Sequence, residues 1–221
     1  REHAMGSIMN GVALHGGFRI YGSTFLVFAD YMRPPVRLAA LMKLPVIYVF
    51  THDSFYVGED GPTHEPVEQV ESLRIILGLH NFRPADANET AWAWMAALRR
   101  TEGPTAIILT RHNIPVLEGT SAEGLNRGAY ILKDVEGRPD LVLLASGSEV
   151  SLAVETAKLL EAEGKKARVV SVPCRELFLE QDQEYQRSVL GEGIPRVAIE
   201  ALIGTGWYRL VGLNGLVISM D

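Results

Sequence analysis

The stretch from Thr51 to His64, T-H-D-S-F-Y-V-G-E-D-G-P-T-H, concentrates side chains that could do chemistry within a sequence of 221 residues. It combines two histidines, two aspartates and a glutamate with two glycines and a proline. Histidine transfers protons near neutral pH and carboxylates bind hydroxyl groups, whereas glycine and proline constrain the path of the backbone. A loop that only joins two elements rarely needs both properties, so we interpret this stretch as part of a functional site.

The position of the loop supports this interpretation. It follows the apolar run 45–50, which predicts a strand, and Arg111 follows a second such run at 105–110. His52 and Arg111 therefore come directly after two predicted strands, at the end where open α/β sheets bind their ligands. Arginine and histidine together suit a phosphate group, and an aspartate such as Asp60 suits a sugar hydroxyl.

Other common chemistries find little support in the sequence. His64 and Glu68 have a spacing that can chelate zinc, but no third ligand follows at a suitable distance, so we expect no metal site within these residues. The sequence carries no P-loop and no G-x-G-x-x-G after a strand, and Ser7 and Ser54 lack the surroundings of a hydrolase nucleophile.

Two features near the amino terminus allow two interpretations each. Residues 1–15 predict a helix with Glu2 in its first turn, where a carboxylate either balances the helix dipole or takes part in catalysis. Phe25, Phe28 and Tyr31 recur every third residue, and such a stripe belongs either to the core or to the wall of a pocket for a flat ring.

The remaining periodicity predicts alternating helices and strands. In the first half we expect strands at 18–21, 45–50, 81–84 and 105–110, and helices at 24–32, 36–43, 64–77 and 88–100, with Pro34-Pro35 opening the second of these helices and Asn88 capping the last. In the second half we expect strands at 129–132, 141–145, 167–172, 196–199 and 216–220, and helices at 148–163 and 176–190.

Polar residues without apolar periodicity occupy 119–128, which predicts a linker. We therefore expect an α/β protein of two consecutive three-layer domains with mostly parallel sheets, at 1–118 and 129–221. The chain opens without methionine inside a helical pattern and stops directly after an apolar run, so we expect it to be part of a longer polypeptide.

Composition disfavours several classes of partner. A net charge of −6 and an isoelectric point near 5.6 argue against nucleic acid. The single Cys174 allows no internal disulfide and suits a reducing compartment, so we expect a cytoplasmic location. The longest apolar stretch, 38–50, is interrupted by Lys43 and Pro45 and is too short to span a membrane.

Six segments of the sequence resemble transketolase, a thiamine-diphosphate-dependent enzyme. They are R-E-H-A-M-G at 1–6, Y-G-S-T-F-L-V-F at 21–28, T-H-D-S at 51–54, G-E-D-G-P-T-H-E-P-V-E at 58–68, R-P-A-D at 83–86 and A-S-G-S-E-V-S-L-A at 145–153. The resemblance implies a pyrimidine-binding domain that lacks its first part, followed by a transketolase C-terminal domain that is incomplete at its end.

The same resemblance implies a cofactor site. Glu2 would be the catalytic glutamate that hydrogen-bonds the aminopyrimidine ring of thiamine diphosphate. Phe25, Phe28 and Tyr31 would line the slot for the cofactor rings, with Phe28 against the pyrimidine. The diphosphate and its magnesium or calcium ion would be held by a domain that lies outside this sequence.

It also implies a substrate site. His52 and Arg111 would hold the phosphate of a sugar, Asp60 a donor hydroxyl, and His64 a hydroxyl or carbonyl oxygen near the reacting carbon, with His52 and His64 both catalytic. Phe55-Tyr56 stand where the family usually has a smaller pair, which implies a narrower or differently shaped substrate channel.

The implied reaction moves a two-carbon ketol group from a ketose phosphate to an aldose phosphate, in the pentose phosphate pathway. The implied enzyme is a homodimer with its active site at the subunit interface, so this stretch alone is expected to be inactive. Deoxyxylulose-phosphate synthase and dihydroxyacetone synthase share a related D-G-P-T-H loop and stay as alternatives, as does a non-catalytic partner subunit of a split enzyme. R-E-H-A-M and the E-P-V-E continuation favour transketolase.

Overall fold

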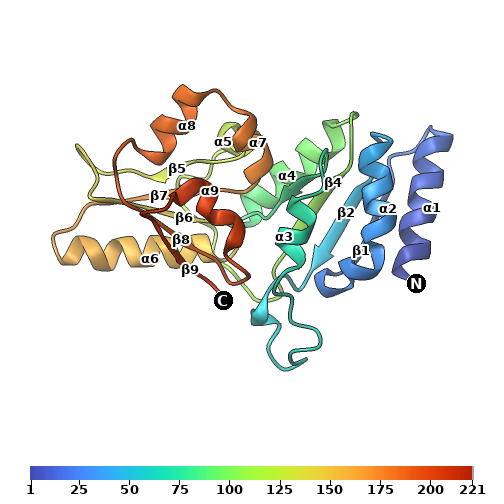
Figure 1. Cartoon of the computed structure of the whole chain (residues 1–221), viewed down its shortest axis with the longest axis horizontal. Coiled ribbons are helices and arrows are strands. Elements are labelled where there is room, and N and C mark those ends of the chain that lie inside the picture. Colours follow the sequence, from blue (N-terminus) through green and yellow to red (C-terminus); the bar gives the residue numbers. More distant parts are fainter. Residues whose placement is uncertain (221) are drawn as a thin grey trace. The chain divides into compact units, whose positions relative to one another are not determined.

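The computed structural model describes residues 1–220, and these fall into two compact units. Unit 1 comprises Arg1–Phe82 and Ala91–Asn113, and unit 2 comprises Arg83–Thr90 and the chain from Ile114 onward. Both units are α/β with mostly parallel sheets, which confirms the predicted fold class (Figure 1). The domain limits expected from the sequence, 1–118 and 129–221, stay a prediction.

The sheet of unit 1 is entirely parallel. Its order is β1 (Tyr21–Phe25), β2 (Ile47–Thr51), β4 (Thr105–Leu109) and β3 (His80–Phe82). The central strands β2 and β4 consist almost wholly of buried residues, as strands covered on both faces do. The register pairs Phe25 with Thr51 and Thr51 with Leu109, so three strands end level at one edge of the sheet.

One face of this sheet is covered by α4 (Ala87–Arg99), whose first turn belongs to unit 2 and whose remainder belongs to unit 1. Ala97 packs with Ile47, Val49 and Ile107, residues that alternate along the strands and so point to the same side. Apolar contact on this face therefore holds α4 to the sheet.

The opposite face is covered by α1 (Glu2–His15) and α2 (Ala29–Leu41). The buried Tyr48 hydroxyl donates to Asn10 Oδ1 at 3.2 Å, and Asn10 Nδ2 donates to the Pro35 carbonyl at 2.9 Å. These hydrogen bonds link strand, first helix and second helix, which completes the three layers of unit 1.

The structure corrects the predicted break at Pro34-Pro35. A 3₁₀ turn, η1 (Leu26–Phe28), leads into one continuous helix, α2, with both prolines inside it. An interior proline costs about 3 kcal/mol because it removes a backbone donor. Here α2 buries Met32, Pro35 and Val36 on one face, and we attribute its continuity to that packing.

Several boundaries also differ from the prediction. The first strand begins at Tyr21 rather than 18, and the helix expected over 64–77 is only α3 (Gln69–Arg74). The Gln69 side chain accepts from the Val67 N–H at 2.9 Å, so the residues before α3 form a turn. Asp86 rather than Asn88 caps α4, because its Oδ1 accepts from the Glu89 N–H at 2.8 Å.

The sheet of unit 2 has five strands in the described residues, and the two strands that follow the central one in the chain lie on opposite sides of it. Its order is β5 (Tyr130–Lys133), β7 (Ala167–Ser171), β6 (Leu141–Ala145), β8 (Arg196–Ile199) and β9 (Leu216–Ile218), with only β5 antiparallel. The strand that follows β6 in the chain, β7, lies on one side of it, and the next, β8, lies on the other. The carboxyl end of β6 is therefore a topological switch point.

Helices cover both faces of this second sheet. One face carries α6 (Glu149–Ala162), and the other carries α7 (Arg175–Glu180), α8 (Gln183–Leu190) and α9 (Tyr208–Val211). The single helix predicted over 176–190 is two, because the Asp182 side chain accepts from the Tyr185 N–H and starts a new helix. The predicted linker contains the short helix α5 (Ala122–Asn126). No helix within residues 1–220 combines the length and apolar character needed to cross a bilayer.

Two glycines of α1 should respond in opposite ways to the same substitution. A β-carbon on Gly6 would lie 2.7 Å from Cγ of Pro35, a ring atom that cannot swing away, whereas a β-carbon on Gly11 meets nothing within 4 Å. We expect Gly6→Ala to lower the free energy of unfolding by about 1–3 kcal/mol. Gly11→Ala should raise it by about 0.5–1 kcal/mol through helix propensity. Chemical denaturation of both variants measures the difference, and a stabilised Gly6→Ala would contradict the close packing of α1 on α2.

Candidate active site

The site begins where β1 and β2 end side by side. His52, the first residue after β2, has a φ of 61°, a left-handed conformation that is uncommon for a residue other than glycine. Its imidazole stacks on the ring of Phe25 with centroids 3.7 Å apart and planes 23° apart, and its Nδ1 lies 2.9 Å from Thr51 Oγ1. Strained backbone of this kind gathers at functional sites.

A row of three aromatic rings, those of Phe25, Phe28 and Tyr31, extends from this stack and is called the ring row below. Phe25 and Phe28 are 6.2 Å apart and nearly parallel, Phe28 and Tyr31 are 6.1 Å apart, and the His64 imidazole meets Phe28 edge-on at 5.7 Å. Phe25 and Phe28 are half-buried, and Tyr31 is 64% exposed. The stripe seen in the sequence is therefore a partly open surface of rings rather than a piece of the sealed core.

Charged groups surround the imidazole of His52. Burial lowers the pKa of His52 and the Arg111 guanidinium lowers it further, whereas the carboxylates of Asp60 and Asp53 act in the opposite direction. Arg111 and Asp60 therefore lie close enough to influence His52 electrostatically. Arg111 Nη2 also forms an ion pair with Glu59 Oε1 at 3.2 Å, and both side chains are well exposed.

The Phe55-Tyr56 pair lies in the short 3₁₀ helix η2 (Phe55–Val57) of the same loop. The two rings are 4.3 Å apart, and Tyr56 lies 4.8 Å from the imidazole of His112. His112 Nδ1 is 2.8 Å from Thr110 Oγ1. His112 is a residue of this region without a predicted role, although its position next to Arg111 after a strand is the same signal that indicates the arginine.

Glu2 occupies the first turn of α1, as predicted. A hydrogen bond from its own backbone N–H lowers the pKa of its carboxyl group, while burial acts the other way, so the group is an ionised acceptor at neutral pH. Within residues 1–220, its carboxylate forms no hydrogen bond or ion pair with the other seven predicted site residues. The structure therefore joins seven of the eight predicted site residues through ring contacts or charge, and Glu2 is not among them.

The ring row also tests whether thiamine diphosphate fits this chain. The nearly parallel, half-buried rings of Phe25 and Phe28 and the tilted, exposed ring of Tyr31 offer an apolar wall for a flat heterocycle, so these residues fit the ring part of such a cofactor. In the part of the chain that the structure describes, no three side chains among histidine, cysteine, aspartate and glutamate gather as metal ligands would.

The fold and the site define an α/β protein with a partly exposed row of aromatic rings at the carboxyl edge of a parallel sheet. Its sequence matches two family descriptions, the transketolase pyrimidine-binding domain over residues 1–116 and the transketolase-like C-terminal domain over residues 128–221. The chain belongs to the transketolase family.

Individual transketolases align with this chain over its whole length. It is 55% identical to the transketolase of Aquifex aeolicus and spans 33% of that protein. It superposes on a transketolase from Leishmania mexicana with a TM-score of 0.96 and 47% identity, covering 32% of that chain. A Pichia stipitis transketolase in complex with sedoheptulose-7-phosphate gives a TM-score of 0.94 and 43% identity, again over all of this chain and 32% of the other. The present chain thus spans about a third of the length of these relatives.

The surroundings of His52 predict opposite pKa changes from two substitutions. Arg111→Gln removes a cation that disfavours the imidazolium form, so the pKa of His52 should rise. Asp60→Asn removes an anion that favours that form, so the pKa should fall. NMR titration of protein labelled at histidine measures both, with Arg138→Gln in unit 2 as a control that leaves His52 unchanged. Shifts of the same sign, or none, would show that these side chains do not surround His52.

Proposed function

We propose that the protein acts as a transketolase, which transfers a two-carbon ketol group from a ketose phosphate to an aldose phosphate in the pentose phosphate pathway. The observation that carries the proposal is the 55% identity to a transketolase over the entire chain. The clustering of His52, Arg111 and the ring row at one sheet edge supports it. The cofactors are thiamine diphosphate and magnesium or calcium, with the metal held by a part of the enzyme outside this chain.

In this proposal the ring row holds the cofactor. Phe25, Phe28 and Tyr31 would contact its rings, and the ionised Glu2 would accept a hydrogen bond from the ring nitrogen of the aminopyrimidine. When bound, thiamine diphosphate supplies the electron sink that lets a carbon–carbon bond next to a carbonyl break. The residues of this chain orient the reacting groups and handle protons.

Arg111 and His52 would bind the phosphate of the sugar. The ion pair of Arg111 with Glu59 joins side chains that are 41% and 82% exposed, and such pairs contribute only about 0–1 kcal/mol. A phosphate dianion can therefore replace Glu59 as the partner of the guanidinium. Because burial and Arg111 lower the pKa of His52, its neutral imidazole is available as a hydrogen-bond donor.

Asp60 and His64 would bind the oxygen atoms of the sugar chain. Asp60 is exposed in the loop and suits a donor hydroxyl. His64 Nδ1 lies 2.9 Å from Thr63 Oγ1, which leaves Nε2 for a hydroxyl or carbonyl oxygen near the reacting carbon. Phe55-Tyr56 would narrow the approach to these groups.

We propose in addition that the full-length enzyme is a cytoplasmic homodimer with its active site at the subunit interface. The relatives are about three times longer than this chain, which supports a contribution from other segments. Residues 1–221 alone are then inactive.

The reaction itself tests the proposal. Full-length protein incubated with xylulose 5-phosphate, ribose 5-phosphate, thiamine diphosphate and magnesium should form sedoheptulose 7-phosphate. Pyruvate consumption would instead identify a deoxyxylulose-phosphate synthase, and transfer to formaldehyde a dihydroxyacetone synthase. Folded protein that converts none of these substrates would favour the non-catalytic partner subunit.

The same assay tests the role of Glu2. Glu2→Ala should lower turnover by at least about 100-fold, since proton handling by one positioned group contributes that much or more. Glu163→Ala, an exposed glutamate of unit 2, is the matched control. Wild-type turnover in the Glu2 variant would remove that residue from the mechanism.

Phosphate recognition gives a second, more local test. Arg111→Ala and His52→Ala should each lower kcat/KM for ribose 5-phosphate by about 10–100-fold, because hydrogen bonds to a charged group contribute about 1.5–3 kcal/mol. With glycolaldehyde, an acceptor that carries no phosphate, the same variants should lose little. Equal losses with both acceptors would mean that these side chains serve another purpose.

A further inference from the structure

Two buried carboxylates meet at the switch point of the second sheet. Glu149 follows β6 at the start of α6, and Glu200 follows β8, the strand next to β6. Their side chains are each 1% exposed. In open α/β sheets this position, outside the carboxyl ends of the strands, is where ligands bind.

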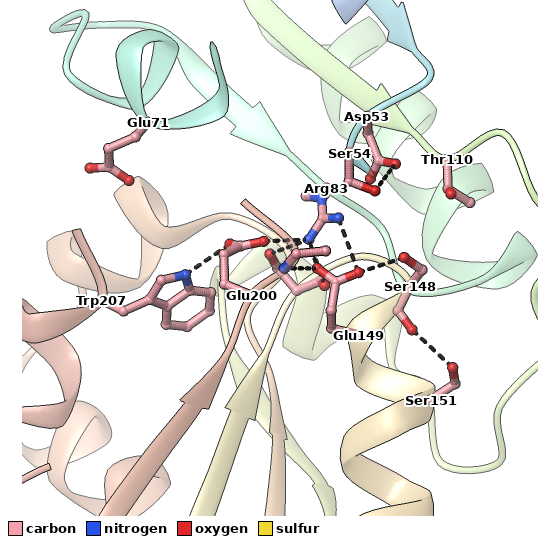
Figure 2. A network of polar contacts seen from close by, with 12 residues as sticks. Asp53, Ser54, Glu71, Arg83, Thr110, Ser148, Glu149, Ser151, Glu200 and Trp207 are labelled. Atoms are coloured by element: carbon pink, nitrogen blue, oxygen red, sulfur yellow. Dashed lines mark hydrogen bonds and ion pairs between the residues drawn. The ribbon is translucent and has the colours of Figure 1, made fainter. Parts of the chain in front are cut away.

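The guanidinium of Arg83 fills this place in unit 2 (Figure 2). Its Nη1 donates to Glu200 Oε1 at 2.9 Å and to the Ser146 carbonyl at 3.0 Å, and its two terminal nitrogens donate to the two oxygens of Glu149. The Arg83 side chain is fully buried. A planar fork with several donors is what two carboxylates and a carbonyl can accept together.

The carboxylates are also held by groups other than Arg83. Ser148 Oγ and the Ala201 N–H donate to Glu149 at 2.6 Å and 3.1 Å. Trp207 Nε1 donates to Glu200 Oε2 at 2.8 Å. These donors come from unit 2, so the acceptor oxygens have their own supports and do not depend on the arginine alone for their positions.

Gly147 lies directly against the guanidinium of Arg83. Its φ is +59°, and a β-carbon built on it would lie 2.7 Å from Cζ and 2.8 Å from Nε of Arg83. The backbone of Arg83 is fixed as well, because its N–H donates to the Pro173 carbonyl at 2.8 Å and its carbonyl accepts from the Gly147 N–H at 2.9 Å. The flat cation therefore lies against bare backbone.

The two buried carboxylates, Glu149 and Glu200, also favour a cation at this position. Burial raises the pKa of Glu149, Arg83 lowers it, and the neighbouring Glu200 carboxylate raises it again. Without the guanidinium, burial and Glu200 would favour the protonated acid, and the hydrogen bond from Ser148 would be the smaller opposing effect.

We propose that the switch-point crevice of unit 2 is a binding site for a guanidinium group, that the chain's own Arg83 is its built-in ligand, and that a free alkylguanidinium binds there once this side chain is removed. This site is separate from the proposed transketolase function and goes beyond it. Arg83 comes from the segment Arg83–Thr90, which belongs to unit 2.

Chemical rescue tests the site. Arg83→Ala deletes the atoms that N-ethylguanidinium would restore, so the variant of the full-length protein should unfold about 10 °C below the wild type. N-ethylguanidinium in large excess over its Kd, yet too dilute to denature, should raise that midpoint by about 5 °C. N-ethylurea, which has a similar shape but no charge, and ethylammonium, which has charge but no fork, should not raise it.

Two matched variants make the result specific. Arg168→Ala removes another arginine of unit 2, which binds the more exposed Asp134 at 2.9 Å and 3.0 Å, and N-ethylguanidinium should not restore its stability. Adding Glu149→Gln to Arg83→Ala should abolish the rescue. Equal responses to all three additives, or no response from folded Arg83→Ala protein, would overturn the proposal.

If Arg83→Ala does not fold on its own, refolding from denaturant becomes the measurement. Recovery of folded protein with N-ethylguanidinium but not with N-ethylurea supports the site. Equal recovery with both additives, or recovery with neither, refutes it.

Discussion

Parallel strands that end level at one edge of a sheet are the constraint on which both units depend. In unit 1 the register carries Phe25, Thr51 and Leu109 to the same height across three neighbouring strands. Residues that follow these strands must then meet, although they lie far apart in the chain. The stack of Phe25 on His52 and the charge of Arg111 near that imidazole follow directly from this alignment.

The two units use this edge in opposite ways. In unit 1 the arginine at the edge pairs with an exposed glutamate, and such exposed pairs contribute only about 0–1 kcal/mol. In unit 2 the arginine is fully buried between two carboxylates, and removing one partner of such a group costs about 3–5 kcal/mol. Solvent exposure of the ion pair thus distinguishes the edge of unit 1 from that of unit 2.

Local patterns in the sequence predict where strands end, but they do not predict contacts between residues far apart in the chain. Apolar β-branched runs predicted β2 and β4, and with them the places of His52 and Arg111. The predicted helix break at Pro34-Pro35 is wrong, because no local pattern shows that Pro35 packs against α1. The contacts of Arg83 have no signal in the sequence, since no spacing rule links it to glutamates 66 and 117 positions later. The left-handed backbone of His52 likewise has no signal in its residue type.

Phe25 and Phe28 contact two imidazoles of unit 1, those of His52 and His64. A centroid distance of 3.7 Å is van der Waals contact, so His52 cannot turn without displacing Phe25, whereas His64 meets Phe28 edge-on at 5.7 Å. The left-handed φ of His52 persists because this stack and Thr51 hold the side chain in place. These side chains are therefore already ordered in the folded chain, and groups that are ordered before binding lose less entropy on binding. Ring contacts therefore order His52 and His64 against Phe25 and Phe28, whereas Arg111 and Asp60 act on His52 through charge and stay exposed to solvent.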